Sequence, residues 1–249
     1  MGEKIGLGLG GSSNADGKVS SKSLQARAKK EEGSFSPEAG WDDVKLKTFR
    51  RHIVELGKTG FTFIYDELEA EEPVTWSYLL HTVTNPMNVN MVNGFVHVQA
   101  TSKNGISDAY LLGSDELKTD TTSHFFTPAT NWLRADDKGN FKKYPNHWHF
   151  TATSGKHKVY RFVTIIHTHI NKTTPDKPFS IPQRLKDGSI KMGSWIIKAN
   201  VSSAGKPSFD VRFPRPQYDA AVTYDGDVTV VREDGYETTL RDKLPELEI

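Results

Sequence analysis

Two pairs of histidines have the residue type and spacing of metal ligands. His147 and His149 lie in NHWHF, and His167 and His169 lie in IIHTHI. Residues two apart on a β-strand share a face, so each pair would direct two imidazoles at one ion. Zinc needs a third protein ligand, which no nearby motif supplies, and the second pair alternates with Ile and Thr as in an ordinary amphipathic strand. We therefore interpret both pairs as structural or surface residues and assign the chain no cofactor.

Four residues are candidates for contact with a sugar substrate. Arg51 is one, because a guanidinium forms paired hydrogen bonds with carboxylate or sulfate groups. Trp132, His147 and His149 are the others, since an aromatic face is able to stack on a sugar ring and Arg and Lys lie nearby in sequence. The competing interpretation of Arg51 is a cross-strand ion pair with the acidic segment Glu67–Glu72. Trp76 and Trp148 are further candidates for stacking on a sugar, but buried aromatics dominate sandwich cores, and the core is the default position of Trp76 and Trp195.

Composition excludes several classes of function. The 249 residues carry 32 Lys and Arg against 31 Asp and Glu, so a net charge of +1 gives no electrostatic reason to expect nucleic acid or an acidic membrane as partner. The chain has no cysteine, which excludes disulfides, thiolate nucleophiles and cysteine zinc sites. No apolar run reaches the length of a membrane span.

Segments with the alternation of β-strands recur from residue 41 onward, and helix signals are almost absent. Turn dipeptides such as Asn93-Gly94 stand between them, which favours hairpins. We expect an all-β fold, a multi-stranded antiparallel β-sandwich of stacked sheets with very little helix. The expected strands are Val44–Leu56, Gly60–Glu67, Val74–Val83, Phe95–Ala100, Asp108–Gly113, His147–Ser154, Lys158–His169, Lys191–Val201 and Ser208–Phe213.

The same patterns divide the chain into three parts. Residues 1–40 are rich in Gly, Ser and Lys, and we expect them to be irregular. Residues 41–216 form the predicted sandwich. Residues 217–249 hold a small β-meander, placed at Ala220–Leu240, and a tail, and we expect them to pack on the sandwich.

The segment Phe49–Val83 carries the clearest motifs in the chain. An acidic run, Asp66–Glu72, closed by Pro73, predicts a solvated loop between two strands. The block resembles the C-terminal β-domain of the heparinase II/III-like polysaccharide lyases, clearly over Val44–Val83 and more weakly through Asp108–Ile166. The resemblance rests on an RHxxxL motif, a YDxLEA motif and a WxxLHT motif, here Arg51, His52 and Leu56, then Tyr65, Asp66, Leu68, Glu69 and Ala70, then Trp76, Leu80, His81 and Thr82.

The resemblance implies a role in bacterial degradation of acidic, uronic-acid-containing glycans such as glycosaminoglycans or alginate by β-elimination. The partners it implies are an acidic polysaccharide or oligosaccharide and an N-terminal helical toroid of a parent protein. The parent would be periplasmic or secreted, and this chain, which starts without a secretory signal, would be a piece of it. Alone, the chain is expected to lack activity.

In that family the catalytic Tyr lies mainly on the toroid, and a His comes from an early H-x-H-x-D-x-G-S-F segment of the β region. This chain keeps only the GSF of that segment, at residues 33–35, so no catalytic or metal residue transfers to it. A divalent metal in the full-length enzyme stays open. The alternative function is a non-catalytic carbohydrate-binding or structural β-sandwich module.

Overall fold

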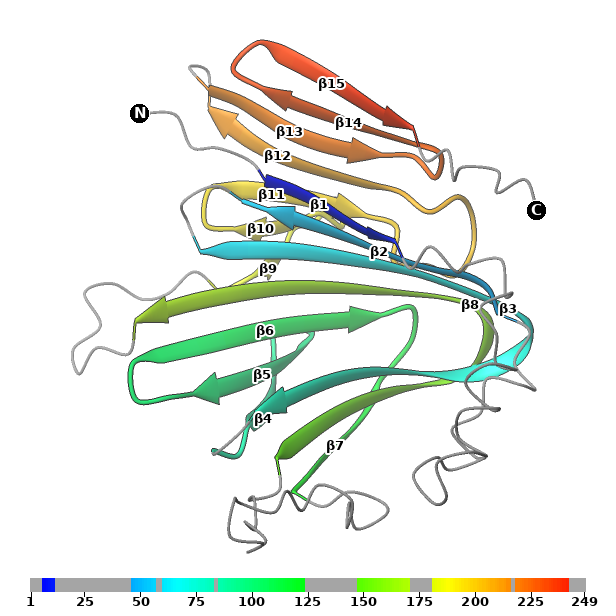
Figure 1. Ribbon diagram of the computed structural model, residues 1–249, viewed down its shortest axis with the longest axis vertical. Helices are drawn as coiled ribbons and strands as arrows, with labels where there is room; N and C mark the ends of the chain where they lie inside the picture. Colours follow the sequence, from blue (N-terminus) through cyan, green and yellow to red (C-terminus); the bar gives the residue numbers. More distant parts are fainter. Residues whose placement is uncertain are drawn as a thin grey trace, which may run out of the picture.

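The computed structural model describes residues 6–11, 46–56, 60–82, 85–123, 147–170, 181–215 and 218–241. These residues form fifteen β-strands in two antiparallel sheets and contain no helix (Figure 1). Within these ranges, therefore, no helical segment is long and apolar enough to cross a membrane. The predicted all-β sandwich is confirmed.

The first sheet has eight strands in the order β1-β2-β3-β8-β6-β5-β4, with β7 paired to β8 beside this path. Its central strands, β3 and β8, are 22 and 23 residues long. The bounds are β1 Gly6–Gly11, β2 Leu46–Glu55, β3 Phe61–Thr82, β4 Asn88–Val92, β5 Phe95–Thr101, β6 Gly105–Gly113, β7 Lys118–Thr122 and β8 Trp148–Ile170.

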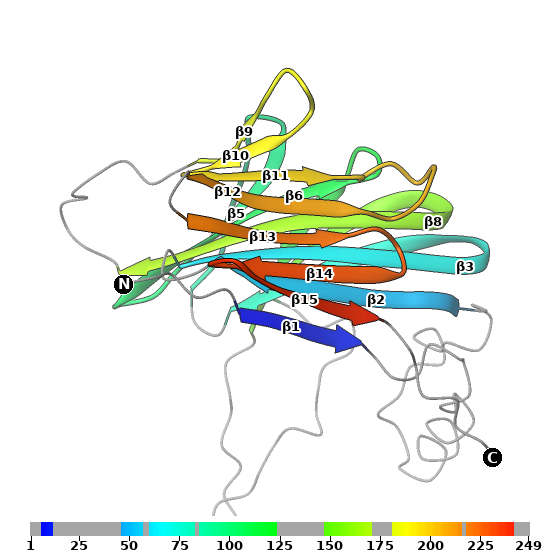
Figure 2. The ribbon, with the colours of Figure 1, turned by 90° about the horizontal axis from the view of Figure 1, so that it is seen from above.

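The second sheet has seven strands that neighbour one another in chain order, from β9 to β15. It lies against one face of the first sheet, as Figure 2 shows from above. The bounds are β9 Gln183–Arg184, β10 Ile190–Met192, β11 Trp195–Ala199, β12 Phe209–Arg215, β13 Tyr218–Tyr224, β14 Val228–Glu233 and β15 Tyr236–Arg241.

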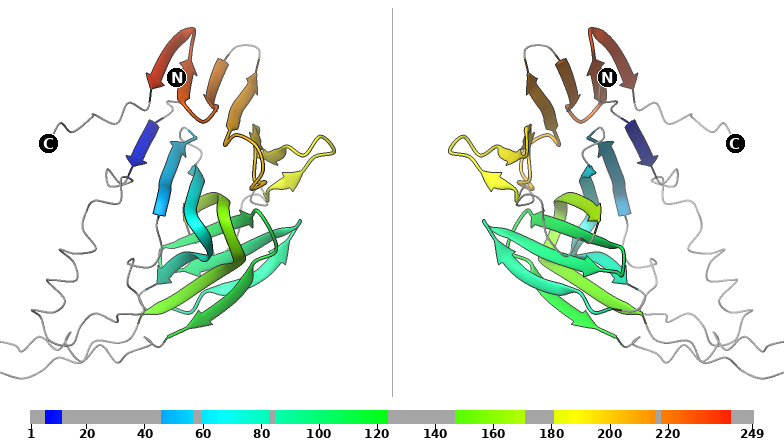
Figure 3. Two further views of the ribbon diagram at one scale, coloured as in Figure 1. Left: turned by 90° about the vertical axis from the view of Figure 1, so that its right-hand side faces the viewer. Right: turned by 90° about the vertical axis from the view of Figure 1, so that its left-hand side faces the viewer.

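The two long strands, β3 and β8, bend together, so the first sheet folds back on itself. The pairing of β3 with β8 is irregular between Glu69 and Val74 and again between Thr75 and Ser77. Beyond the bend, Val74–Thr82 of β3 and Trp148–His157 of β8 run back, with β7, under the first parts of the pair (Figures 1 and 3). These first parts, Phe61–Glu69 of β3 and Val159–His167 of β8, form a middle layer that is covered on both faces. The first sheet therefore supplies two of the three layers.

Each face of this middle layer has its own apolar core. Between the two sheets, Phe63 and Tyr65 of β3 pack with Trp195 and Phe209 of the second sheet, and all four are 3% exposed or less. Between the middle layer and the folded-back halves lies a second core, which includes Trp76, Tyr78, Phe150, Tyr160 and Phe162.

The acidic run of β3 is where the sequence prediction was wrong. The strand continues through it, and Asp66 and Glu67 are only 3% and 6% exposed. A buried carboxylate is tolerated when a cation or hydrogen bond pairs with it, and β2 supplies those partners. Pro73 falls in the irregular stretch of the pairing, where its missing N–H leaves no ladder bond unmade.

Two hairpins follow the predicted turn chemistry. Asn93 and Gly94 between β4 and β5 have φ values of 50° and 81°, and Asp234 and Gly235 between β14 and β15 have 50° and 84°. Two successive residues with positive φ are typical of the tight turn that matches strand twist, and Asn, Asp and Gly adopt it at low cost. The predicted hairpins therefore form.

At both ends of the chain, strands extend the sheets. Gly6–Gly11, within the part predicted to be irregular, pairs with Arg50–Glu55 of β2 as β1. The meander predicted at Ala220–Leu240 is present as β13, β14 and β15, and β13 pairs directly with β12. The second sheet therefore runs across the predicted boundary at residues 216 and 217.

Candidate functional site

A cluster of polar side chains surrounds Asp108 on the face of the first sheet that carries the inter-sheet core. Strand β6 lies between β5 and β8, so Asp108 stands opposite Gln99 on one side and His167 on the other. His97 faces Tyr110 one step along the same strands, and its ring stacks on the Tyr110 ring with centroids 4.7 Å apart. The sheet register therefore gathers residues from three strands at one carboxylate.

Both oxygens of the Asp108 carboxylate are engaged. Oδ1 accepts a hydrogen bond from Gln99 Nε2 at 2.9 Å and lies 2.8 Å from His97 Nε2, while Oδ2 lies 3.0 Å from His169 Nε2. Burial raises the pKa of Asp108, but the contacts from His97, Gln99 and His169 outweigh burial and bring it to about 2. The group is an anion at neutral pH.

His167 of β8, directly opposite Asp108 of β6, is the last member of the cluster. It is 8% exposed, and the ring of Phe61 packs against it with centroids 4.4 Å apart. Burial, and then the neighbouring His169, lower the pKa of His167, so its imidazole is neutral at pH 7. One ligand atom each from Asp108, His167 and His169 lie within 4.8 Å of one another, the only such trio of His or acidic residues found among the described residues.

A second group of charges joins β2 to β3. Arg51 donates from Nε to Asp66 Oδ1 at 2.6 Å and from a terminal nitrogen to Oδ2 at 2.9 Å, which is a two-pronged ion pair. The Arg51 guanidinium also lies over the Tyr78 ring, 5.3 Å from its centroid. The cross-strand pairing considered for Arg51 thus forms, one residue before the segment Glu67–Glu72.

The neighbouring pair extends into the second sheet. His52 Nε2 lies 2.7 Å from Glu67 Oε1, and the His52 ring packs on Tyr224 of β13 with centroids 4.2 Å apart. Arg50 donates to the Tyr224 hydroxyl at 2.8 Å and lies 3.7 Å from Glu67. Burial, followed by the hydrogen bond to Glu67, raises the pKa of Tyr224. This phenol stays protonated, and the group fastens one sheet to the other.

Tyr65 and Asp66, a Tyr beside a carboxylate, do not converge on one centre. The Tyr65 hydroxyl donates to the Asn200 carbonyl at 2.9 Å across the inter-sheet core, and burial raises its pKa. Asp66 is adjacent on the strand and therefore points to the opposite face, where it meets Arg51. The two residues act as packing and pairing groups.

The predicted sugar contacts lie apart from one another. Arg51 is directed at the second core, whereas His149 packs edge-on against His81 at the far end of β3, with ring centroids 4.6 Å apart. His147 is exposed just before β8. Trp132 lies outside the described residues. Their contact with a sugar stays a prediction.

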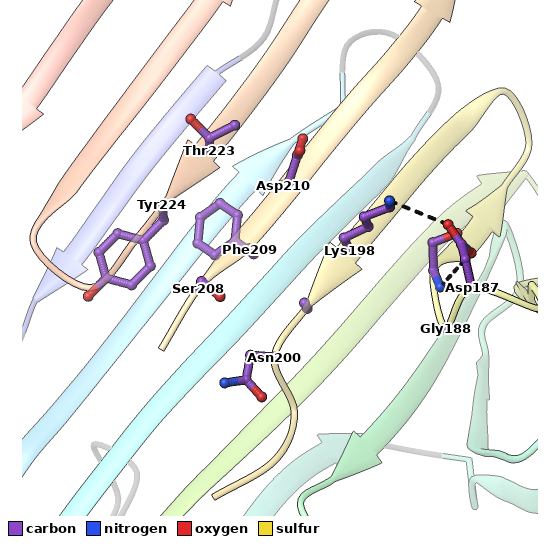
Figure 4. Close-up of a pocket in the computed structure, with 11 residues that line it drawn as sticks. Asp187, Gly188, Lys198, Asn200, Ser208, Phe209, Asp210, Thr223 and Tyr224 are labelled. Atoms are coloured by element: carbon purple, nitrogen blue, oxygen red, sulfur yellow. Dashed lines mark hydrogen bonds and ion pairs between the residues drawn. The ribbon is translucent and has the colours of Figure 1, made fainter. Parts of the chain in front are cut away.

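A shallow depression of about 510 Å³ opens on the outer face of the second sheet (Figure 4). Lys198, Asp210 and Thr223 project into it from β11, β12 and β13, and Lys198 lies 3.4 Å from Asp187 of the turn before β10. Its lining combines charged side chains of both signs with apolar surface that includes Ala199 and Phe209.

Sequence patterns missed Asp108 and His97 as members of any site. Asp108 is a lone acidic residue near the start of the apolar segment DAYLLG, and a buried charge in such a segment was the available signal. His97 lies in an ordinary strand. Only the order of strands in the sheet, with β6 between β5 and β8, brings these residues to His167 and His169.

No protein-family model and no curated protein matches this chain.

Proposed function

We propose that this chain is the β-sandwich module of a polysaccharide lyase of the heparinase II/III-like kind, which cleaves uronic-acid-containing glycans together with a helical toroid outside the chain. The observation that carries the proposal is the pairing of two of the three motifs behind the resemblance. The RHxxxL residues on β2 lie in register with the YDxLEA residues on β3, with Arg51 opposite Asp66 and His52 opposite Tyr65.

The all-β architecture supports the proposal, because the resembled region is a β-domain and the chain forms stacked antiparallel sheets. The residues of these two motifs are packing and pairing groups of β2 and of the middle layer. Such residues keep a domain rigid, as a module that holds one wall of a cleft must be.

The reaction would be β-elimination. A base takes the proton from the carbon next to the uronic carboxylate, the electron pair forms a carbon–carbon double bond, and the bond to the glycosidic oxygen breaks as that oxygen gains a proton. The base and acid would be supplied by the toroid. This chain would hold the glycan's acidic groups near His147 and His149 and would support the toroid, while Arg51 stays paired with Asp66.

The test compares the isolated chain with its parent protein. Each is incubated with alginate, heparin and chondroitin sulfate, and the short-wavelength ultraviolet absorbance of unsaturated uronate is followed. We expect product from the parent and none from the isolated chain. Strong activity of the isolated chain, or a parent that lacks a helical repeat region and forms no unsaturated product, would contradict the proposal.

The depression of Figure 4 favours a second candidate, a carbohydrate-binding module without catalysis. The charged side chains of this site, which include Lys198 and Asp210, suit hydrogen bonding to hydroxyl and carboxylate groups of a sugar, and its apolar surface suits the faces of sugar rings. Under this candidate an acidic oligosaccharide binds the purified chain in calorimetry, and Lys198→Ala weakens binding whereas Lys103→Ala, at an exposed turn, does not. Equal binding by both variants would exclude the depression as the site.

A further inference from the structure

We infer that Asp108, His167 and His169 form a binding site for a divalent transition-metal ion of the zinc class. Nothing in this inference rests on the proposed lyase function. One carboxylate and two imidazoles are a common ligand set for zinc, and a bound water completes four-coordination in such sites.

The donor positions fit an ion with small side-chain rotations. Zinc binds imidazole nitrogen and carboxylate oxygen at about 2.0 to 2.2 Å, so ligand atoms of a tetrahedral site lie about 3.3 to 3.6 Å apart. His169 Nε2 and Asp108 Oδ2 are 3.0 Å apart, and the three ligand atoms lie within 4.8 Å of one another. All three residues are on paired strands, β6 and β8, which hold their backbones in place.

The contacts around the imidazoles place their nitrogens where a cation would bind. His169 has its Nδ1 at 3.4 Å from the Ile170 carbonyl and its Nε2 at 3.0 Å from Asp108 Oδ2, so both nitrogens face oxygens. A neutral imidazole has one proton to donate. In the tautomer with its proton on Nε2, His169 donates to Asp108 directly. In the other tautomer Nε2 directs a lone pair toward the carboxylate, which is the state in which it would bind a metal ion beside Asp108.

His97 repeats this arrangement outside the trio. Its Nδ1 lies 2.8 Å from Asn90 Oδ1 and its Nε2 lies 2.8 Å from Asp108 Oδ1. With Gln99, it holds the carboxylate oxygen that faces away from His169. Residues that orient a ligating carboxylate in this way are typical of metal centres.

Access to the site is narrow but open. The side chains of His97 and His169 are 13% and 10% exposed, against 6% for Asp108, so the cluster reaches solvent on its histidine side. The apolar ring of Phe61 closes the other side against His167. A metal ion would enter past the imidazoles and lie at the edge of the inter-sheet core.

Another histidine–carboxylate pair in the chain offers a matched control. His157 Nε2 lies 2.6 Å from Asp115 Oδ2, closer than any pair in the cluster, but both side chains are about one-third exposed. This pair belongs to no trio of ligands among the described residues. His157→Gln therefore removes a histidine from a carboxylate without touching the inferred site.

The experiment titrates the metal-free full chain with Co²⁺, whose visible absorption is strong in four-coordinate sites, and then displaces it with Zn²⁺. We expect one equivalent of Co²⁺ with intense bands, unchanged in His157→Gln. His167→Gln and His169→Gln should lose the bands, and His97→Gln should weaken affinity about 10- to 100-fold, as outer-sphere changes do. Circular dichroism of each variant establishes that it is folded.

Two results would overturn the inference. One is that the wild-type chain takes up no metal, which would mean that imidazole N–H groups and Gln99 alone satisfy Asp108. The other is metal uptake that is equal in wild type, His167→Gln and His169→Gln. Asp108→Asn, which keeps the side-chain shape, serves as a third ligand variant if either Gln variant fails to fold.

Discussion

Two carboxylate–histidine groups of the first sheet use similar residues to different ends. At β2 and β3, Arg50 and Arg51 provide guanidinium groups to Glu67 and Asp66, and His52 is sealed between Glu67 and Tyr224. Around Asp108 the contacts come from two imidazoles and an amide. A guanidinium is always charged and therefore neutralises a buried carboxylate at any physiological pH. An imidazole carries a charge only when it is protonated, and in its neutral form it is able to bind a metal ion. The first group is therefore structural and the second is suited to a ligand.

The substitution with the largest expected effect on stability removes a carboxylate from the structural group. Glu67→Ala leaves Arg50 and the buried His52 without their shared carboxylate and removes a link to Tyr224. Removing one member of a buried charge network typically costs about 3 to 5 kcal/mol. Urea unfolding should show a loss of about 3 kcal/mol in the free energy of unfolding. A loss below about 1 kcal/mol would show that the network does not fasten the sheets.

The next largest effect is the stabilisation of the folded chain by Zn²⁺ bound at the Asp108 group. If Zn²⁺ binds only the folded chain, a free concentration of 100 times Kd raises the free energy of unfolding by about 2.7 kcal/mol. Urea unfolding with and without Zn²⁺ should show this rise for wild type and for Lys103→Ala. It should be absent in Asp108→Asn. A rise of the same size in Asp108→Asn would place the metal elsewhere.

Acid should weaken the Asp108 group in the metal-free chain. The folded pKa of Asp108 is about 2, below the ordinary value of about 3.9 in an unfolded chain. Because the folded pKa is lowered, its contribution is fully present above about pH 4 and is lost as the pH falls to about 2, up to about 2 kcal/mol. The stability difference between wild type and Asp108→Asn should shrink over this window. A constant difference would contradict the lowered pKa.

The smallest effect comes from an exposed pair at the edge of the structural group. Lys47 lies 3.6 Å from Glu69, and both side chains are about half exposed. Such pairs contribute little because water screens them and the side chains lose freedom on pairing. Lys47→Ala should change the free energy of unfolding by about 0.5 kcal/mol or less in urea. A loss near that of Glu67→Ala would remove the distinction between buried and exposed pairs.

The sequence predicted the class of fold because strand alternation and turn residues are local signals. Asn93-Gly94 and Asp234-Gly235 formed the expected hairpins for this reason. The path of β3 was not predictable in the same way. Alternation presumes one buried face, but the bend in β3 and β8 covers both faces of the middle layer, so Asp66 and Glu67 appeared too polar for a strand.

The candidate site was less predictable than the fold. The spacing of His167 and His169 was visible in sequence, but Asp108 lies about sixty positions earlier and joins them only through the pairing of β6 with β8. The register of distant strands is set by the packing of the whole sheet. A third ligand supplied across strands is therefore invisible to a search of neighbouring residues.

The most direct test of the contrast between the two groups is zinc X-ray absorption spectroscopy on the full chain loaded with one equivalent of Zn²⁺. The account predicts nitrogen and oxygen neighbours at about 2.0 to 2.2 Å, with the outer-shell scattering of two imidazoles. It also predicts that this scattering falls in His169→Gln and is kept in His157→Gln. A spectrum of hydrated zinc, or one that His169→Gln leaves unchanged, would contradict it.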